Sequence, residues 1–488
     1  CDTQKGIRNF IAIIVLSIWM GCLSCYGENQ NDQIQSLFKG TQQATVFYLD
    51  NGMEVILIEN HANPMAAVVT IVKTGSRNED AASNGSAHFL EHLLFNGTKT
   101  RTQKQIYDEM DFYGGYNNAH TGPDYTNYMI LMPKEYIAQG MDIQADMLFN
   151  SNLPDEKFEK ERGIIIEEIG KSADRPEYQI NNHFQRTFYA GTPYERPVLG
   201  TVSTISHLKR EDVWEYYRTW YVPNNTTLMV IGDFSTSEMV ELVKKKYGTY
   251  PAGSIPEHST VKLNPPERLR IILVNGMGKF PKDRRYLSMG YLLPPPTTED
   301  FQAIEFLTEF LGGREDSILK TLFEQEQHKN LIHEISANLE FNLDFSVLQI
   351  SAELPAEGNM EHVVDLIRQA VLDMEKTAIS LDKIQSSLIA RATHEIYLQE
   401  NLHYYGMMKS PYLVAGGYNF LRNYMTDLMR VTPQSIQKAA AQYVSNQIPV
   451  VTVMSPPLEK PTGETAPQSP NKYHKEKLEN GLTVVIKE

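Results

Sequence analysis

The segment His88-Phe89-Leu90-Glu91-His92 places two histidines and a glutamate within one short stretch. On a helix, His88 and His92 share one face, because residues four positions apart are neighbours there. Two imidazoles on one face can bind one zinc ion, and a catalytic zinc site needs a third protein ligand and an open position for water. From a position beside the metal, the Glu91 carboxylate can accept a proton from zinc-bound water and later deliver it to the leaving amine. The spacing therefore predicts a zinc-dependent hydrolase.

A solvent-exposed helix face without any metal is the alternative interpretation of this segment. Its neighbours weigh against that alternative, because Phe89, Leu90, Leu93 and Leu94 form an apolar side that predicts a mostly buried helix. Buried imidazole and carboxylate groups need partners, and a metal ion supplies them.

The third ligand is expected from a glutamate-rich segment further along the chain, at residues 159–168. Glu161 and Glu168 lie two helical turns apart on one face, whereas Glu167 is turned by about 100°. The isoleucines at 164–166 by themselves favour a strand. The residues alone therefore leave both the element and the ligand open.

The elements expected around these residues alternate between extended and helical segments. A hairpin turn is predicted at Asp50-Asn51-Gly52, and Ser235 with Glu238 predicts a capping box at the start of a helix. The extended segments are 46–58, 65–74, 116–132 and 226–232, and the helices are 86–95, 103–112, 134–150 and 155–171.

Composition divides the chain into two large units, 45–250 and 269–454, joined by the proline-containing segment 251–268. A spacer rich in Pro, Ser, Thr and Glu follows at 455–472. Leu478–Ile486 then resembles Leu49–Leu57, so residues 473–488 are expected to begin a second copy of the fold within a longer protein. The alternative is that two generic Asn-Gly hairpins look alike.

Further short motifs accompany the histidine segment and give the chain a family resemblance. Glu168 follows His92 with 75 residues between them. The other motifs are Phe95-Asn96-Gly97-Thr98, Asn118-Ala119-His120-Thr121, Tyr221-Val222-Pro223-Asn224-Asn225 before Gly232-Asp233, and Leu311-Gly312-Gly313. With these, residues 45–455 resemble the M16 metallopeptidases, the group of pitrilysin, insulin-degrading enzyme and the mitochondrial processing peptidases.

The resemblance implies a role for each candidate residue. His88, His92 and Glu168 would bind Zn²⁺, Glu91 would be the general base, and Glu161 would hold or tune a zinc ligand. Asn118 and Ala119 would lie on an edge strand to which a peptide substrate adds as a further strand. The residues leave two alternatives open, a solvated surface glutamate at 161 and turn chemistry at 118.

The resemblance also implies the fold and the activity. The fold would be α+β, with two homologous units that are each a mostly antiparallel sheet with helices packed on one face. The protein would be a zinc endopeptidase acting on peptides or small unfolded polypeptides. Family members complete the site with an Arg and a Tyr from a second M16 half, and nothing in residues 269–454 matches that pair. The rival interpretation is a non-catalytic M16-type scaffold or peptide-binding subunit.

Composition and the first residues bear on partners and location. The chain has 488 residues, 41% of them hydrophobic, and a net charge of −15, which argues against nucleic acid as a partner. Residues 1–27, with Lys5 and Arg8 before an apolar run, resemble a signal peptide, so export to the bacterial periplasm, free or membrane-tethered, is expected. An uncleaved anchor is the alternative. All three cysteines lie in this segment, so no thiol chemistry is expected elsewhere.

Overall fold

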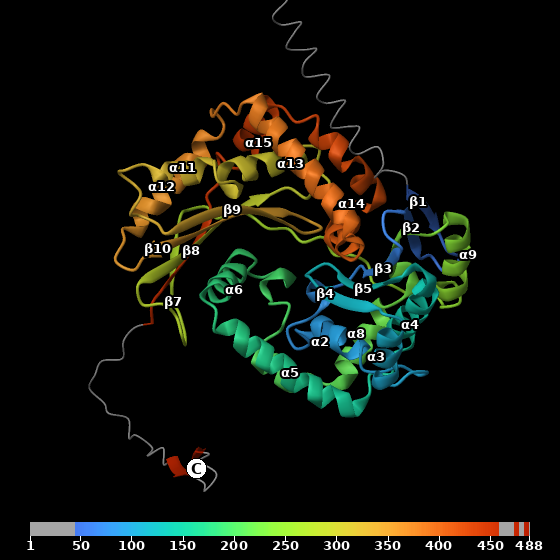
Figure 1. The fold of residues 1–488 in the computed structure, drawn as a ribbon. Helices are drawn as coiled ribbons and strands as arrows, with labels where there is room; N and C mark the ends of the chain where they lie inside the picture. The colour runs from blue at the N-terminus through green and yellow to red at the C-terminus, as the bar shows by residue number, and fades with distance from the viewer. Residues whose placement is uncertain (1–43, 458–472, 478–482, 488) are drawn as a thin grey trace, which may run out of the picture.

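The computed structural model describes residues 44–457, 473–477 and 483–487. It contains two large sheets with helices packed against them (Figure 1). Both sheets are mostly antiparallel, which confirms the α+β class. The expected signal segment 1–27 and residues 458–472 of the expected spacer lie outside the described residues.

The first sheet has the strand order β1-β2-β6-β3-β5-β4, and β2 with β6 is its one parallel pair. The central strands β3 and β6 are mostly apolar and buried on both faces, so both faces of the sheet need covering. The strands are β1 (Ala44–Tyr48), β2 (Glu54–Glu59), β3 (Met65–Val72), β4 (Tyr116–Thr121), β5 (Thr126–Pro133) and β6 (Thr226–Gly232).

The second sheet has the order β7-β11-β8-β10-β9, which repeats the first order from β2 onward. Its one parallel pair, β7 with β11, takes the place of β2 with β6. The two units therefore share a topology, as expected for related units. The strands are β7 (Ile271–Asn275), β8 (Arg284–Leu293), β9 (Glu334–Phe341), β10 (Ser346–Pro355) and β11 (Val450–Ser455).

The helices occupy similar places between the strands of the two units, with one more helix before the last strand of the first unit and a further helix after it. Those of the first unit are α2 (Ser86–Leu94), α3 (Gln103–Phe112), α4 (Ile137–Asn150), α5 (Asp155–Ala173), α6 (Pro176–Phe188), α7 (Val202–His207), α8 (Arg210–Trp220) and α9 (Thr236–Tyr247). Those of the second unit are α10 (Phe301–Thr308), which continues into a π-helical turn at Glu309–Gly313, then α11 (Ile318–Glu324), α12 (Met360–Asp373), α13 (Leu381–Glu400), α14 (Leu402–Leu428) and α15 (Pro433–Tyr443).

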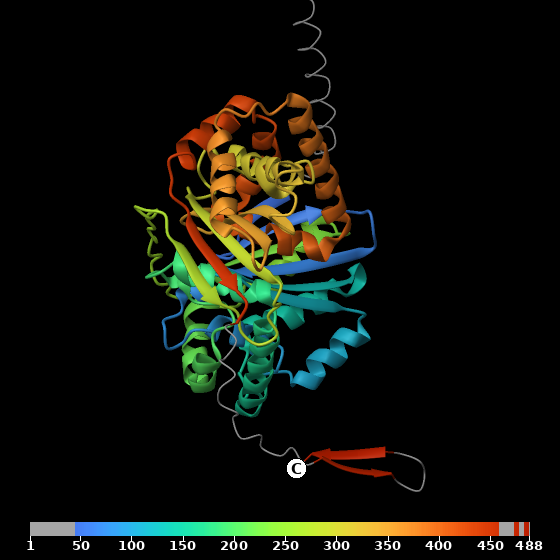
Figure 2. The same cartoon turned by 90° about the vertical axis from the view of Figure 1, so that its left-hand side faces the viewer.

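Each unit contributes a helix that packs on the sheet of the other unit (Figure 1). The helices of the first unit cover one face of the first sheet, and α14 covers the opposite face, where Tyr405 and Leu413 pack with Val69. In return, α6 packs on β8 and β11. Gly290 permits this approach, because a Cβ there would lie 2.4 Å from the Phe184 ring. The view turned by 90° shows the helices of the second unit, yellow to red, gathered in the upper part of the molecule (Figure 2).

The segment 251–268 has no regular secondary structure, yet it is fixed between the units. The buried Arg77 guanidinium donates to the Ser259 carbonyl at 2.8 Å, to Asp124 at 3.2 Å and to Asp344 at 3.3 Å. Asp124 belongs to the first unit and Asp344 to the second, so one side chain joins both units and the segment between them. The domain division at 45–250 and 269–454 remains an interpretation, because α6 and α14 each pack across it.

The start of α9 differs from the expected capping box. The Ser235 side chain makes no cap hydrogen bond, and the Thr236 amide donates instead to the Glu59 carboxylate at 2.7 Å. Glu59 ends β2, so a residue distant in sequence satisfies this helix terminus. The local pattern gave the wrong partner because it contains no information about the neighbouring strand.

The last two described strands repeat the register of the first two. β12 (Tyr473–Lys477) pairs antiparallel with β13 (Thr483–Lys487), from Tyr473↔Lys487 to Lys477↔Thr483. In β1 and β2 the pairs run from Ala44↔Ile58 to Tyr48↔Glu54, at the offset that relates the two sequences. Among the helices that the structure describes, none is long and apolar enough to span a membrane.

Candidate metal centre

The two helices that carry the candidate ligands are held together by apolar contacts. In α2, Phe89, Leu90, Leu93 and Leu94 are buried, as the sequence predicts. In α5 the buried residues recur at helical spacing, at 158, 161, 165, 169 and 172, so the isoleucine run is part of a helix and not of a strand. The rings of Phe89 and Phe158 stack at a centroid distance of 4.4 Å. This contact fixes α2 against α5.

Three side chains from these helices form a group of the kind that binds a metal ion. His88 Nε2 and His92 Nε2 each lie 3.8 Å from Glu168 Oε2. Two ligands of a tetrahedral zinc ion are roughly 3.3–3.6 Å apart, given ligand distances of about 2.0–2.2 Å. Two imidazole nitrogens and one carboxylate oxygen are also the donor types that zinc takes. In the described part of the chain, this is the one such group of three or more residues.

The charge state of His88 also suits a metal ligand. Burial, together with the imidazoles of His92 and His120, lowers the pKa of His88 to about 3. His88 is therefore a neutral imidazole at neutral pH, which is the form that coordinates a metal. Glu168 is the most accessible of the three, with 43% of its side chain exposed. The group is thus open to solvent on the Glu168 side.

A chain of hydrogen bonds holds the other nitrogen of His92. Glu161 Oε2 lies 3.2 Å from His92 Nδ1, and Glu161 Oε1 accepts from Asn96 Nδ2 at 3.1 Å. The Asn96 amide also donates to the His92 carbonyl at 2.8 Å and accepts from Gln103 Nε2 at 2.6 Å. Glu161 is buried and does not belong to the three-residue group. Its contact with Nδ1 leaves Nε2 of the same ring facing Glu168.

Glu91 lies on α2 between the two histidines, and it is not one of the three grouped residues. Thr121, the last residue of β4, donates its hydroxyl to Glu91 Oε2 at 2.5 Å. Burial is the largest cause that raises the pKa of Glu91, and the bond from Thr121 opposes it. The carboxylate is therefore held in one orientation beside the histidines.

Strand β4 is the last strand of the first sheet on the side of the site. It pairs with β5, and α2 lies against it. Asn118 is exposed, and its side-chain oxygen accepts from the Ala119 amide at 2.9 Å. That amide is not used in the ladder, so it faces the outer edge of the strand. A cavity of about 270 Å³ lies here, lined by Glu91, His92, Asn118 and Ala119 among others.

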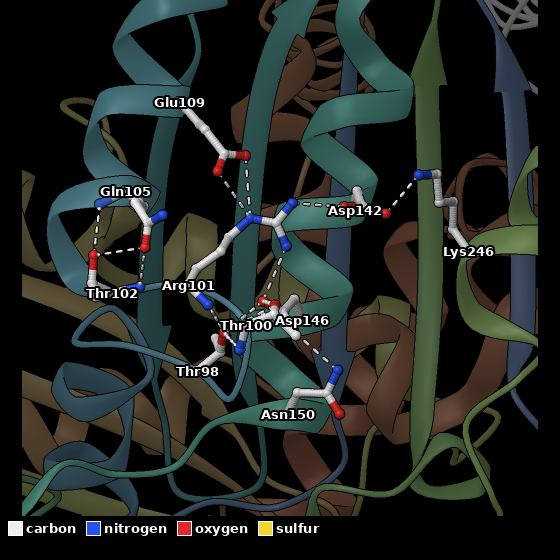
Figure 3. Close-up of polar contacts among 10 residues, drawn as sticks. All are labelled: Thr98, Thr100, Arg101, Thr102, Gln105, Glu109, Asp142, Asp146, Asn150 and Lys246. Atoms are coloured by element: carbon white, nitrogen blue, oxygen red, sulfur yellow. Dashed lines mark hydrogen bonds and ion pairs between the residues drawn. The ribbon is translucent and has the colours of Figure 1, made fainter.

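An ion cluster centred on Arg101 fixes the loop and helix that border this cavity (Figure 3). Arg101 contacts Glu109 on α3 at 3.1 Å, and Asp142 and Asp146 on α4 at 2.7 and 3.0 Å. The Thr102 hydroxyl caps α3 through a reciprocal bond with Gln105. The start of α3, which includes Gln103, is therefore anchored to α4.

Sequence reasoning did not assign Asn96, Gln103 or Thr121 to the site. Asn96 and Thr121 fall within motifs that carried the family resemblance, and Asn96 follows His92 by one helical turn. That spacing was a usable signal for a contact with His92. Gln103 gave no signal of its own, because its contact depends on how the loop 96–102 folds back.

A site with three protein ligands and one open side is typical of catalytic rather than structural zinc. Comparisons with known proteins identify the family. Residues 54–202 match the family described as Insulinase (Peptidase family M16), and residues 207–388 match the Peptidase M16 inactive domain. The chain belongs to the M16 peptidase family.

Named relatives and solved structures agree with this assignment. An uncharacterized zinc protease of Mycobacterium leprae is 28% identical over 338 residues, which cover 68% of this chain and 74% of the relative. The crystal structure of a protease from Helicobacter pylori has a TM-score of 0.77 at 22% identity, and covers 85% of this chain and 100% of its own. The first half of the periplasmic protease PqqL from Escherichia coli has a TM-score of 0.66 at 21% identity, with 85% and 92% covered. The two structures support the fold alone.

Proposed function

We propose that this protein is a zinc-dependent endopeptidase that hydrolyses peptides or small unfolded polypeptides. The observation that carries the proposal is the group of His88, His92 and Glu168. The Glu91 carboxylate lies next to this group and is not one of its three members. A structural zinc site would have a closed set of four protein ligands, and in the described residues a fourth His, Cys, Asp or Glu does not join the group.

In the proposed mechanism, His88, His92 and Glu168 hold the ion. A bound zinc ion would polarise the scissile carbonyl and lower the pKa of a water molecule. Glu91 takes the proton from the attacking water and delivers it to the leaving amine, and the hydroxyl of Thr121 keeps the carboxylate oriented for both transfers. Glu161 holds His92 by its Nδ1.

The outer edge of β4 would bind the substrate backbone in extended form, as an added strand. The Ala119 amide would exchange its bond with Asn118 for one with a substrate carbonyl. Pairing of this kind uses main-chain atoms, so it selects for an extended peptide more than for particular side chains.

The proposal extends to a second M16 half, in the same chain or as a partner subunit. The register of β12 and β13, which repeats that of β1 and β2, supports the start of a further unit at residues 473–488. We also propose export to the periplasm, on the basis of the charged and apolar pattern in residues 1–27.

The deciding experiment is the zinc content of the purified protein after dialysis against trace zinc, measured by elemental analysis. We expect about one zinc ion per chain for the unchanged protein and a large fall for Glu168→Gln, as one of three protein ligands is lost. The exposed Glu156→Gln on the same helix is the matched control and should keep the metal. An unchanged protein that binds no zinc would favour the non-catalytic scaffold and end the proposal for this chain.

A further inference from the structure

The start of the zinc-site helix α2 has no cap of its own. Its N-cap residue is Gly85, which has a φ of 103° and no side chain to accept a hydrogen bond. A Cβ at this position would lie 2.5 Å from Ile205 Cδ1, so the site requires glycine. The first amides of a helix have no partners within the helix, and here they are buried. Another group must therefore accept from them.

The carboxylate of Glu79 supplies the missing acceptors. Its Oε2 accepts from the Gly85 amide at 2.8 Å and from Asn84 Nδ2 at 2.9 Å, and its Oε1 accepts from the Ala87 amide at 2.7 Å. Glu79 is only 5% exposed. Ala87 directly precedes His88 in the chain. One buried carboxylate therefore holds the turn from which the first histidine projects.

The charge of Glu79 is stabilised mainly by amide donors, with a smaller contribution from the nearby Arg196. The described residues include no salt bridge to its carboxylate, and its oxygens face amide donors at the positive end of the helix dipole. Arg196 instead donates to the main-chain carbonyl of Glu79 at 2.6 Å. That bond fixes the backbone from which the carboxylate extends.

The backbone before Glu79 is anchored as well. Arg77, two residues earlier, binds Asp124 and Asp344 and thereby reaches both units. The Tyr194 hydroxyl accepts from the same guanidinium at 2.8 Å. The short helical turn Ser76–Asn78 contains Arg77 and is therefore held in place by these contacts. It directly precedes Glu79 and fixes the backbone there.

From this arrangement we infer that Glu79 is a positioning residue for the metal centre. The ligands come from two helices, with His88 and His92 on α2 and Glu168 on α5. A shift of α2 along its axis would move both imidazoles relative to Glu168 and weaken the site. Glu79 sets that axial position through the Gly85 and Ala87 amides. The inference rests on the proposed function, since it concerns the same ligand group.

The variant Glu79→Gln tests the inference with little change in volume. Its amide nitrogen cannot accept, so at least one of the three donors loses its partner. We expect the dissociation constant for zinc, measured by chelator competition on the folded protein, to rise by about 10- to 100-fold. With Co²⁺ in place of zinc, the visible absorption bands should also change, because they depend on ligand geometry. A merely structural role would alter neither quantity.

Glu59→Gln is the matched control. Glu59 also accepts from the first turn of a helix, at the Thr236 amide of α9, and α9 carries none of the candidate site residues. Its zinc affinity and Co²⁺ spectrum should stay within about twofold of the unchanged protein, since no ligand is held by that helix.

Hydrogen exchange of the metal-free protein gives a second readout that needs no zinc. In Glu79→Gln, amides of residues 85–92 should exchange faster, while those of α9 should not. Equal exchange and equal zinc affinity in Glu79→Gln and the unchanged protein would overturn the inference. Faster exchange with unaltered zinc affinity would also overturn it, because the cap would then be structural only. If the unchanged protein binds no zinc, the proposed function fails first, and the positioning role fails with it.

Discussion

The two units place different chemistry at corresponding positions of one topology. In the first unit, α2 follows β3 and faces α5, and these two helices carry the histidine and glutamate group. In the second unit, α10 follows β8 and faces α13. There the facing side chains are Glu305 on α10, Glu309 at the start of the π-helical turn that follows it, and Arg391 on α13.

The polar group of the second unit contains its own cation. Arg391 contacts Glu309 at 2.7 Å and Glu305 at 3.8 Å, and its guanidinium lies over the Phe306 ring. Tyr424 accepts from Arg391 at 3.2 Å and donates to Glu305 at 2.7 Å. A guanidinium thus provides the positive charge that a metal ion would provide in the first unit.

The contrast shows how one pair of helices serves either stability or binding. In the second unit, anionic side chains are neutralised by a cation built into the chain, so the cluster contributes to the fold. In the first unit, the ligand group consists of two imidazoles, that of His88 neutral, and a partly exposed carboxylate, and no Arg or Lys of the described chain is part of it. Only the cluster of the second unit contains its own counter-charge, and that difference between the units can be measured.

The largest effect is expected from Glu91→Gln in the first unit. General acid–base catalysis contributes about 10²–10⁴-fold, so peptide hydrolysis should fall by roughly 10³-fold. Zinc content should not change, because Glu91 is outside the ligand group. Hydrolysis of a quenched fluorescent peptide and elemental analysis would be measured on the same sample. Activity within tenfold of the unchanged protein would remove Glu91 from the mechanism.

The next effect concerns the cation of the second unit. Arg391→Met leaves the buried Glu305 without its ion pair and leaves Glu309 with Arg314 alone, so the free energy of unfolding should fall by about 3 kcal/mol. Urea denaturation measures this loss. The triple variant Glu305→Leu, Glu309→Leu and Arg391→Met should recover much of it, since no buried carboxylate is then left unpaired and Arg314 keeps Asp316. Zinc affinity should be unaffected in both variants, and a loss there would contradict the division of roles between the units.

The smallest effect is expected at the edge of the metal centre. Asn96→Ala removes the donor to Glu161 and to the His92 carbonyl, so the dissociation constant for zinc should rise by about 10-fold. Asn117 lines the same cavity, so Asn117→Ala serves as the control and should bind zinc with unchanged affinity. Equal zinc affinities for the two variants would mean that Glu161 holds His92 without help from Asn96.

Much of the local structure was predictable because its signals are local. The helix at 103–112 and the strand at 226–232 have the expected bounds, and the helix at 86–95 is one residue shorter in the structure. Apolar periodicity and glycine breaks determine such elements within a few residues of sequence. The resemblance of the histidine segment to a known family further directed attention to Glu168.

The contacts between distant segments could not be predicted from the same signals. The Glu79 carboxylate accepts from the Gly85 and Ala87 amides further along the chain, and the residues next to Glu79 do not indicate that it caps a helix. The packing of α6 and α14 on the sheets depends on tertiary contacts. In addition, Pro411 and the kink at Gly417 weaken the helical signal of α14 in the sequence. The failed capping box at Ser235 has the same cause, because the true acceptor, Glu59, belongs to another strand.

The exchange of α6 and α14 between the units determines how the polypeptide can be divided. Residues 251–260 are mostly exposed and have no regular secondary structure, so the chain could be divided there into two fragments. Yet a fragment ending there would keep α6 without the sheet it covers, and its own sheet would lose α14. The two pieces are therefore suited to split-protein complementation, in which neither fragment folds well alone and the pair reassembles into one body.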